Sequence, residues 1–65
     1  MQAQYNWIKE HVAQGKTVLA YDRSKPKARV YRLKSMERVT FWSGDIWVHG
    51  LNTRGWTFAL KQEGK

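Results

Sequence analysis

The side chains that could catalyse a reaction or hold a metal are few in this sequence. The chain has two histidines, five carboxylates and no cysteine. Its serines are Ser24, Ser35 and Ser43, and none lies in the Gly-x-Ser-x-Gly turn that exposes a nucleophile. His11 and His49 could meet if a helix docks on a sheet, but a metal site needs three or four ligands and no third candidate has a suggestive spacing. The sequence therefore predicts neither an enzyme nor a metal or other cofactor.

Basic side chains are concentrated in one quarter of the chain. Residues 23–38, called the basic segment here, hold seven of the twelve Lys and Arg residues against one carboxylate, Glu37, and so carry +6 of the formal net charge of +7. The seven cations are Arg23, Lys25, Lys27, Arg29, Arg32, Lys34 and Arg38. Such a patch attracts polyanions and speeds their encounter. Nucleic acid is the commonest polyanion, although an acidic protein or anionic lipid responds to the same field, and solubility alone also explains such charge.

Aromatic side chains accompany this charge, with four Trp, three Tyr and two Phe in the chain. Aromatic faces stack on unpaired bases, and each stack is worth about 1–3 kcal/mol. We predict that Tyr31, Trp42 and Trp47 make such contacts, and we expect Trp7 and Trp56 in the core. The alternative is that all four Trp are core residues, because a chain of 65 residues depends on large rings for burial.

Nucleic-acid binding with low sequence specificity is the leading functional hypothesis. The basic segment, joined by Arg54, would neutralise phosphates while the rings stack on bases, as on other small β-barrels. The choice between DNA and RNA stays open.

A non-enzymatic inhibitor or adaptor that binds an acidic protein surface is the alternative hypothesis. In that case the Trp face would anchor the partner and the basic segment would steer the encounter. A short, basic chain without cysteine that combines a helix with hairpins has the general texture of small phage or mobile-element proteins, so the partner would be a host protein. The residues match no known family at the level of a motif, and self-association is left open.

These side chains must be positioned by a helix and several strands. A helix is predicted over residues 3–14, because Tyr5, Ile8 and Val12 share one stripe at helical spacing. Gly15 suits the position just past the helix end, where a left-handed conformation is easy for glycine. An isolated helix of about 12 residues is marginal, so it must dock on the rest of the chain.

The remainder of the chain is predicted to form strands. Runs of β-prone residues predict strands at 17–21, 28–34, 39–43, 46–51 and 56–61. The stretch from Asp22 to Lys27 contains Pro26, which cannot donate to a ladder, and it predicts a loop. The stretch from Asn52 to Gly55 predicts a second turn.

A two-residue hairpin loop at Gly44 and Asp45 would set the register of the later strands. It places Trp42 opposite Trp47. One sheet face would collect Trp42, Trp47, His49, Leu51, Trp56, Phe58 and Leu60, and the other Val39, Phe41, Ile46, Val48, Thr57 and Ala59. Two apolar faces are unusual for an antiparallel sheet. We therefore expect an α+β fold, an N-terminal helix followed by a four- to five-stranded antiparallel sheet, and leave open that the sheet curls into a small SH3-like barrel.

The length allows a single domain over residues 1–65. No apolar run approaches the roughly 20 residues of a membrane span, and the first residues lack the order of a signal peptide. The absence of cysteine fits a reducing compartment. We therefore expect a cytoplasmic protein without a membrane partner.

Overall fold

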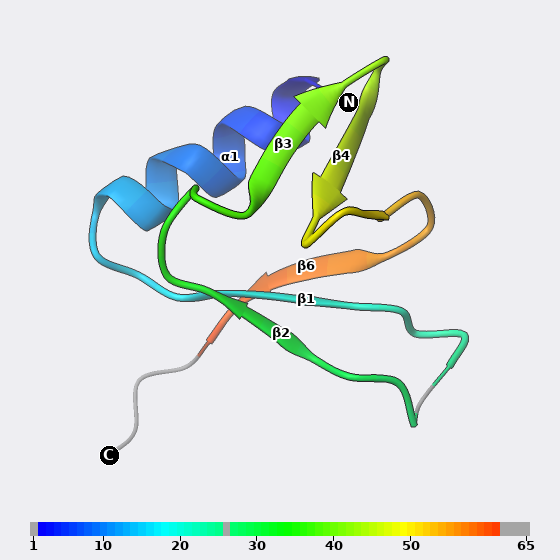
Figure 1. Ribbon diagram of the computed structural model, residues 1–65. Coiled ribbons are helices and arrows are strands. Elements are labelled where there is room, and N and C mark those ends of the chain that lie inside the picture. Colours follow the sequence, from blue (N-terminus) through cyan, green and yellow to red (C-terminus); the bar gives the residue numbers. More distant parts are fainter. Residues whose placement is uncertain (1, 26, 62–65) are drawn as a thin grey trace.

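The computed structural model describes residues 2–25 and 27–61, and in this part of the chain one helix precedes six short strands (Figure 1). The elements are α1 (Gln2–Ala13), β1 (Val18–Tyr21), β2 (Tyr31–Leu33), β3 (Val39–Trp42), β4 (Asp45–Val48), β5 (Leu51–Asn52) and β6 (Thr57–Leu60). The α+β class predicted from the sequence is confirmed. The role predicted for Pro26 falls outside the described residues.

Helix α1 buries the stripe that its spacing predicts. Ile8 is fully buried, and Tyr5 and Val12 are half-buried beside it. The helix ends at Ala13, and Gly15 follows with a φ of 83°. The Gly15 N–H donates to the carbonyl of Val12 at 3.0 Å, which closes the last turn in the manner of a glycine C-cap. The helix therefore stops where the chain must turn toward β1.

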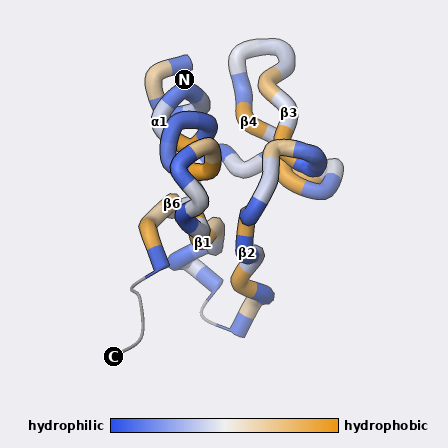
Figure 2. The backbone as a smooth tube through the Cα atoms, turned by 90° about the vertical axis from the view of Figure 1, so that its left-hand side faces the viewer, coloured by the Kyte–Doolittle hydropathy of each residue, from blue (hydrophilic) through white to orange (hydrophobic). Residues whose placement is uncertain are grey.

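The strands form two antiparallel sheets of three strands each, with the orders β2-β1-β6 and β3-β4-β5. Helix α1 and the β3–β4 hairpin lie side by side above β1, β2 and β6 (Figure 2). No strand ladder joins the two sheets within residues 2–25 and 27–61. The single sheet of four to five strands was therefore a wrong expectation, and the closed barrel is not confirmed.

Both sheets and the helix share one hydrophobic core. Every element except β5 and β6 contributes a buried apolar residue to it. These residues are Ile8, Val18, Ala20, Leu33, Val39, Ile46 and Val48. The rings of Tyr5 and Phe41, 5.4 Å apart between centroids, pack α1 against β3 at the edge of this core. The core fixes the relative positions of the loops that surround it.

The β3–β4 hairpin turns one residue earlier than predicted. Ser43 and Gly44 form the loop, with φ values of 55° and 81°, so Trp42 lies opposite Asp45 and Trp47 lies opposite Thr40. Two left-handed residues give the turn type whose twist matches the flanking strands. The pairing of β3 with β4 shifts by two residues. Because side chains alternate along a strand, a shift by an even number leaves each side chain of these two strands on its predicted face. Trp42 and Trp47 therefore still share the face opposite the core.

The predicted strand at 46–51 is interrupted by a second tight turn. His49 and Gly50 have φ values of 52° and 77°, and they connect β4 to the short β5. The last strand consequently does not pair with 46–51. It pairs with β1 instead, where Phe58 lies opposite Ala20. The turn predicted from Asn52 to Gly55 therefore does not join two paired strands.

Candidate functional site

The basic segment lies along one loop, one strand and one bend of the first sheet. Arg23, Lys25, Lys27 and Arg29 belong to the loop between β1 and β2, which extends away from α1 (Figure 1). Arg32 is in the middle of β2, and Lys34 and Arg38 belong to the connection to β3. All seven side chains are exposed. None of them forms an ion pair with a carboxylate of residues 2–25 or 27–61, so their charge is directed to solvent.

The start of the β1–β2 loop is ordered by Asp22. Its carboxylate accepts a hydrogen bond from the Ser24 hydroxyl at 2.7 Å and another from the Ser24 N–H at 3.0 Å. These two bonds hold the pKa of the Asp22 carboxyl below its ordinary value. The Lys25 N–H donates to the Asp22 carbonyl at 3.0 Å and closes a turn. The backbone that carries Lys25 is therefore held in place.

A cleft lies between this loop and β5. It has a volume of ≈ 330 Å³, and we call it the loop cleft. Lys25 and Arg29 line it from the loop, Tyr31 from β2, and Leu51 and Trp56 from the opposite side. It joins cationic and aromatic side chains in one surface. Of the three rings predicted to make contacts, only Tyr31 lines this cleft.

Tyr31 is the centre of an aromatic cluster beside the loop cleft. Its ring stacks on Trp56 with 5.8 Å between centroids and 20° between planes. The imidazole of His49, carried by the β4–β5 turn, lies 5.2 Å away. The Arg29 guanidinium lies 5.7 Å from the centroid of Tyr31, within the range of a cation–π contact. The cluster thus holds one cation of the basic segment against an aromatic surface.

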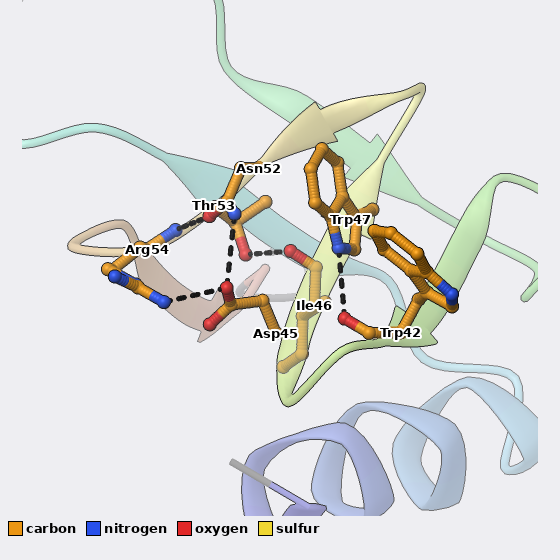
Figure 3. Close-up of polar contacts among 7 residues, drawn as sticks. All are labelled: Trp42, Asp45, Ile46, Trp47, Asn52, Thr53 and Arg54. Atoms are coloured by element: carbon orange, nitrogen blue, oxygen red, sulfur yellow. Dashed lines mark hydrogen bonds and ion pairs between the residues drawn. The ribbon is translucent and has the colours of Figure 1, made fainter.

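The other two predicted rings form a separate pair on the second sheet. The indoles of Trp42 and Trp47 are 6.0 Å apart and inclined by 60°, and the Trp47 Nε1–H donates to the Trp42 carbonyl at 3.2 Å (Figure 3). Trp42 is 65% exposed. In the part of the chain that the structure describes, no hydrogen bond or ring contact links this pair to the basic segment.

Arg54, the cation predicted to join the basic segment, is held in a polar cluster beside β4. Its Nη2 lies 2.8 Å from the Asp45 Oδ2, which also accepts a hydrogen bond from the Asn52 side chain at 3.2 Å (Figure 3). These hydrogen bonds from Asn52 and Arg54 lower the pKa of the Asp45 carboxyl. The buried Thr53 hydroxyl donates to the Ile46 carbonyl at 2.8 Å and fixes the same turn to β4. Arg54 thus compensates the charge of Asp45.

A second cleft lies on the side of this polar cluster. Its volume is ≈ 440 Å³, and we call it the clasp cleft. Asp45 and Arg54 line it together with Gln4 from α1 and the apolar side chains of Trp56 and Phe58. Trp56 lines both clefts. Trp56 packs against the core, as the sequence predicts. Its place in the two clefts was not predicted, because it depends on the pairing of β6 with the distant β1.

The two histidines are held apart by different aromatic partners. The rings of His11 and Trp7 lie 4.6 Å apart within α1, inclined by 44°, and the His11 Nδ1–H donates to the Trp7 carbonyl at 2.9 Å. His49 instead contacts the ring of Tyr31, inclined by 32°. The described residues contain no group of three His, Cys, Asp or Glu side chains that could hold a metal ion.

Comparison with known proteins finds no matching family model, no matching curated protein and no matching solved structure. In the described residues, the helix is too short and too polar to cross a membrane. The geometry of the two clefts and of the exposed Trp pair is therefore the basis for any functional assignment.

Proposed function

We propose that this protein is a non-enzymatic module that binds nucleic acid through the basic segment and the loop cleft. One observation carries the proposal: Arg29 lies over the ring of Tyr31, and both line a cleft that also contains Lys25 and Trp56. Phosphate-binding cations and stacking surfaces therefore adjoin, which is the combination that proteins use for nucleic-acid strands.

The cations supply most of the affinity in this proposal. Lys and Arg side chains neutralise phosphates and release condensed counterions, and this gain does not depend on base sequence. Because the cations of residues 23–38 are exposed and form no ion pair with a carboxylate of the described residues, binding breaks no existing ion pair. We therefore expect low sequence specificity and fast association.

The proposal extends to the architecture of the binding surface. We propose that the two sheets are the halves of a small, open SH3-like barrel. Two observations support this: β6 returns to pair with β1, and both sheets pack on the same core. Small β-barrels present such surfaces to oligonucleotides. In this proposal the β1–β2 loop and the β4–β5 turn form the rim of the binding surface.

A salt titration tests the proposed function. Binding of fluorescein-labelled single- and double-stranded DNA and RNA is followed by anisotropy at increasing NaCl concentration. We expect the logarithm of the association constant to fall linearly with the logarithm of salt, with a slope of about −0.7 to −0.9 for each phosphate contacted. Weak binding that does not respond to salt, for all four probes, would overturn the proposal.

The exposed Trp pair favours a second candidate, an inhibitor or adaptor that binds an acidic protein. A Trp that is 65% exposed is unusual on a chain that needs its rings for burial, and Trp is enriched at the centres of protein interfaces. A stoichiometric partner that survives nuclease and high salt, and is lost with Trp42→Ala, would support this function. Unchanged capture by Trp42→Ala would exclude the Trp pair as the anchor.

A further inference from the structure

The clasp cleft has the chemistry of a nucleobase site, and it adjoins the surface assigned to the phosphates. Its lining includes the apolar side chains of Trp56, Phe58 and Ile46 and the polar side chains of Gln4, Asp45 and Arg54. Its volume of ≈ 440 Å³ falls in the range of small-molecule pockets, about 300–1,000 Å³. Flat aromatic ligands with polar edges fit such a surface.

Trp56 is half-buried against the core, and it lines both clefts. Tyr31 stacks on the indole and lines the loop cleft, whereas the clasp cleft is lined by Trp56 without Tyr31. A base in the clasp cleft would therefore contact Trp56, the residue that this cleft shares with the loop cleft and its cations.

The polar side chains of the clasp cleft can meet the edge of a base without repelling the strand. The Asp45 carboxylate is already paired with the Arg54 guanidinium at 2.8 Å, so the two charges compensate each other. Gln4 is exposed on the first turn of α1 and offers both a donor and an acceptor. Arg54 is 79% exposed and keeps donors for a base or a phosphate.

We propose that the clasp cleft holds an unpaired nucleobase stacked on Trp56, so that the protein's ligand is single-stranded nucleic acid. This inference rests on the proposed nucleic-acid binding and deepens it. A base can enter the clasp cleft only when it is not paired in a duplex, because its ring face and its edge must both be free. The adjoining phosphates then lie against Lys25 and Arg29.

The first measurement compares a 12-nucleotide oligo(dT) with a 12-base-pair dA·dT duplex by anisotropy at one salt concentration. We expect the single strand to bind about tenfold tighter or more, the size of effect that one stacked base gives. Equal affinities would overturn the inference. If both probes bind equally and both lose affinity in Lys25→Ala, the proposed function stands and the base site is rejected. If neither probe binds, the proposed function and the base site are both rejected.

The second measurement follows the four Trp indole N–H signals by ¹H–¹⁵N NMR while oligo(dT) is added, with the Trp56 signal assigned from Trp56→Phe. We expect the Trp56 signal to move and the Trp42 signal to stay in place. A Trp56 signal that does not move at saturation would overturn the inference. The titration itself uses the unaltered protein, and the Trp56→Phe spectrum serves only to identify the Trp56 signal.

Two variants of equal charge complete the test. Gln4→Glu adds a negative charge inside the clasp cleft, and Gln2→Glu adds the same charge on the same helix turn among residues that do not line the cleft. We expect Gln4→Glu to weaken oligo(dT) binding about threefold or more beyond Gln2→Glu, with duplex binding the same in both. Equal effects of the two variants on oligo(dT) would contradict the placement of the base.

Discussion

At the scale of single residues, Tyr31 determines how the basic segment meets the rest of the surface. The Arg29 guanidinium rests at 5.7 Å from its centroid, a contact worth about 0.5–1 kcal/mol on an exposed surface. A cation that is already positioned loses less side-chain freedom when it binds a phosphate. The ring of Tyr31 thus prepares Arg29 for an anion while its other contacts hold Trp56 and His49.

Replacing Lys25 should weaken nucleic-acid binding and its salt dependence together. Lys25→Ala removes a cation that lines the loop cleft, so we expect the salt slope to decrease in magnitude by about 0.7–0.9. Lys9→Ala removes the same charge from the exposed side of α1 and should leave the slope nearly unchanged. Identical slopes for the two variants would show that only overall charge matters. The measurement is anisotropy over a range of NaCl concentrations.

Asp45 should make the free energy of unfolding depend on pH. Its pKa is lowered in the folded state by Asn52 and Arg54, so its stabilisation is present above the unfolded pKa, about 3.9 for Asp, and is lost as pH falls through the folded value. Asp45→Asn should therefore be less stable than wild type near neutral pH, and the difference should shrink in acid. Urea unfolding at about pH 7 and about pH 3 measures both free energies.

Glu10→Gln is the control for this pH dependence, because it removes a carboxylate from the exposed side of α1. The difference in the free energy of unfolding between Glu10→Gln and wild type should not shrink in acid as the difference for Asp45→Asn does. A difference between Asp45→Asn and wild type that is the same at both pH values would mean that the Asp45–Arg54 pair does not stabilise the fold.

At the scale of elements, two tight turns in sequence shape the second sheet. Ser43-Gly44 and His49-Gly50 each place two residues in the left-handed region, and each reverses the chain within a few residues. The second turn brings His49 onto Tyr31 and lets Leu51 and Asn52 line the loop cleft. The β4–β5 turn, which belongs to the sheet of the Trp pair, therefore contacts the sheet that carries the basic segment.

Replacing Gly50 should lower the free energy of unfolding, because this residue has a left-handed backbone conformation. A Cβ at Gly50 would meet no atom within 4 Å, so Gly50→Ala acts through its φ of 77° alone and should reduce the free energy of unfolding by about 1–2 kcal/mol. Gly50→Asn should cost less, because Asn tolerates this region. Equal losses in urea unfolding would argue against backbone strain as the cause.

The elements that the sequence predicts well are those with a strong local pattern. The stripe of Tyr5, Ile8 and Val12 and the glycine after it define α1 to within one residue at each end. The turn at Ser43 and Gly44 was displaced by one position because Gly-Asp is also a common hairpin loop. The turn at His49 was missed because a bulky residue in the left-handed region is uncommon and its neighbours are β-prone.

The candidate site was predictable only in part, for a related reason. The charge of residues 23–38 follows directly from composition, and Tyr31 adjoins it in sequence. The contribution of Trp56 depends on which strand pairs with β6, and this is a contact between distant parts of the chain. Local patterns do not specify such pairing, so Trp42 and Trp47 were grouped with the basic segment although the structure places them on the other sheet.

At the scale of the whole molecule, a small core joins the helix to both sheets. Among the described residues, seven buried apolar side chains meet there, and the largest that are fully buried, Ile8, Val18 and Val48, come from different elements. The clefts lie between elements and not within one element, so their shape depends on this core.

Ile8→Ala should therefore destabilise the entire protein. Deleting a fully buried Ile side chain costs about 2–5 kcal/mol, which is a large part of the 5–15 kcal/mol that stabilises a typical domain. We expect a large fall in the thermal midpoint measured by circular dichroism, and little change for Lys9→Ala on the exposed side of the same helix. Similar midpoints for the two variants would mean that α1 is not part of the cooperative unit.

The inclined pair of Trp42 and Trp47 has an optical consequence. Two indoles held 6.0 Å apart at 60° couple their intense far-ultraviolet transitions, and the coupling produces a paired signal of opposite signs in the far-ultraviolet dichroism spectrum. The β3–β4 hairpin therefore carries an intrinsic chromophore of its own. A strand that binds at Trp56 would leave this signal unchanged, whereas a partner that covers Trp42 would alter it.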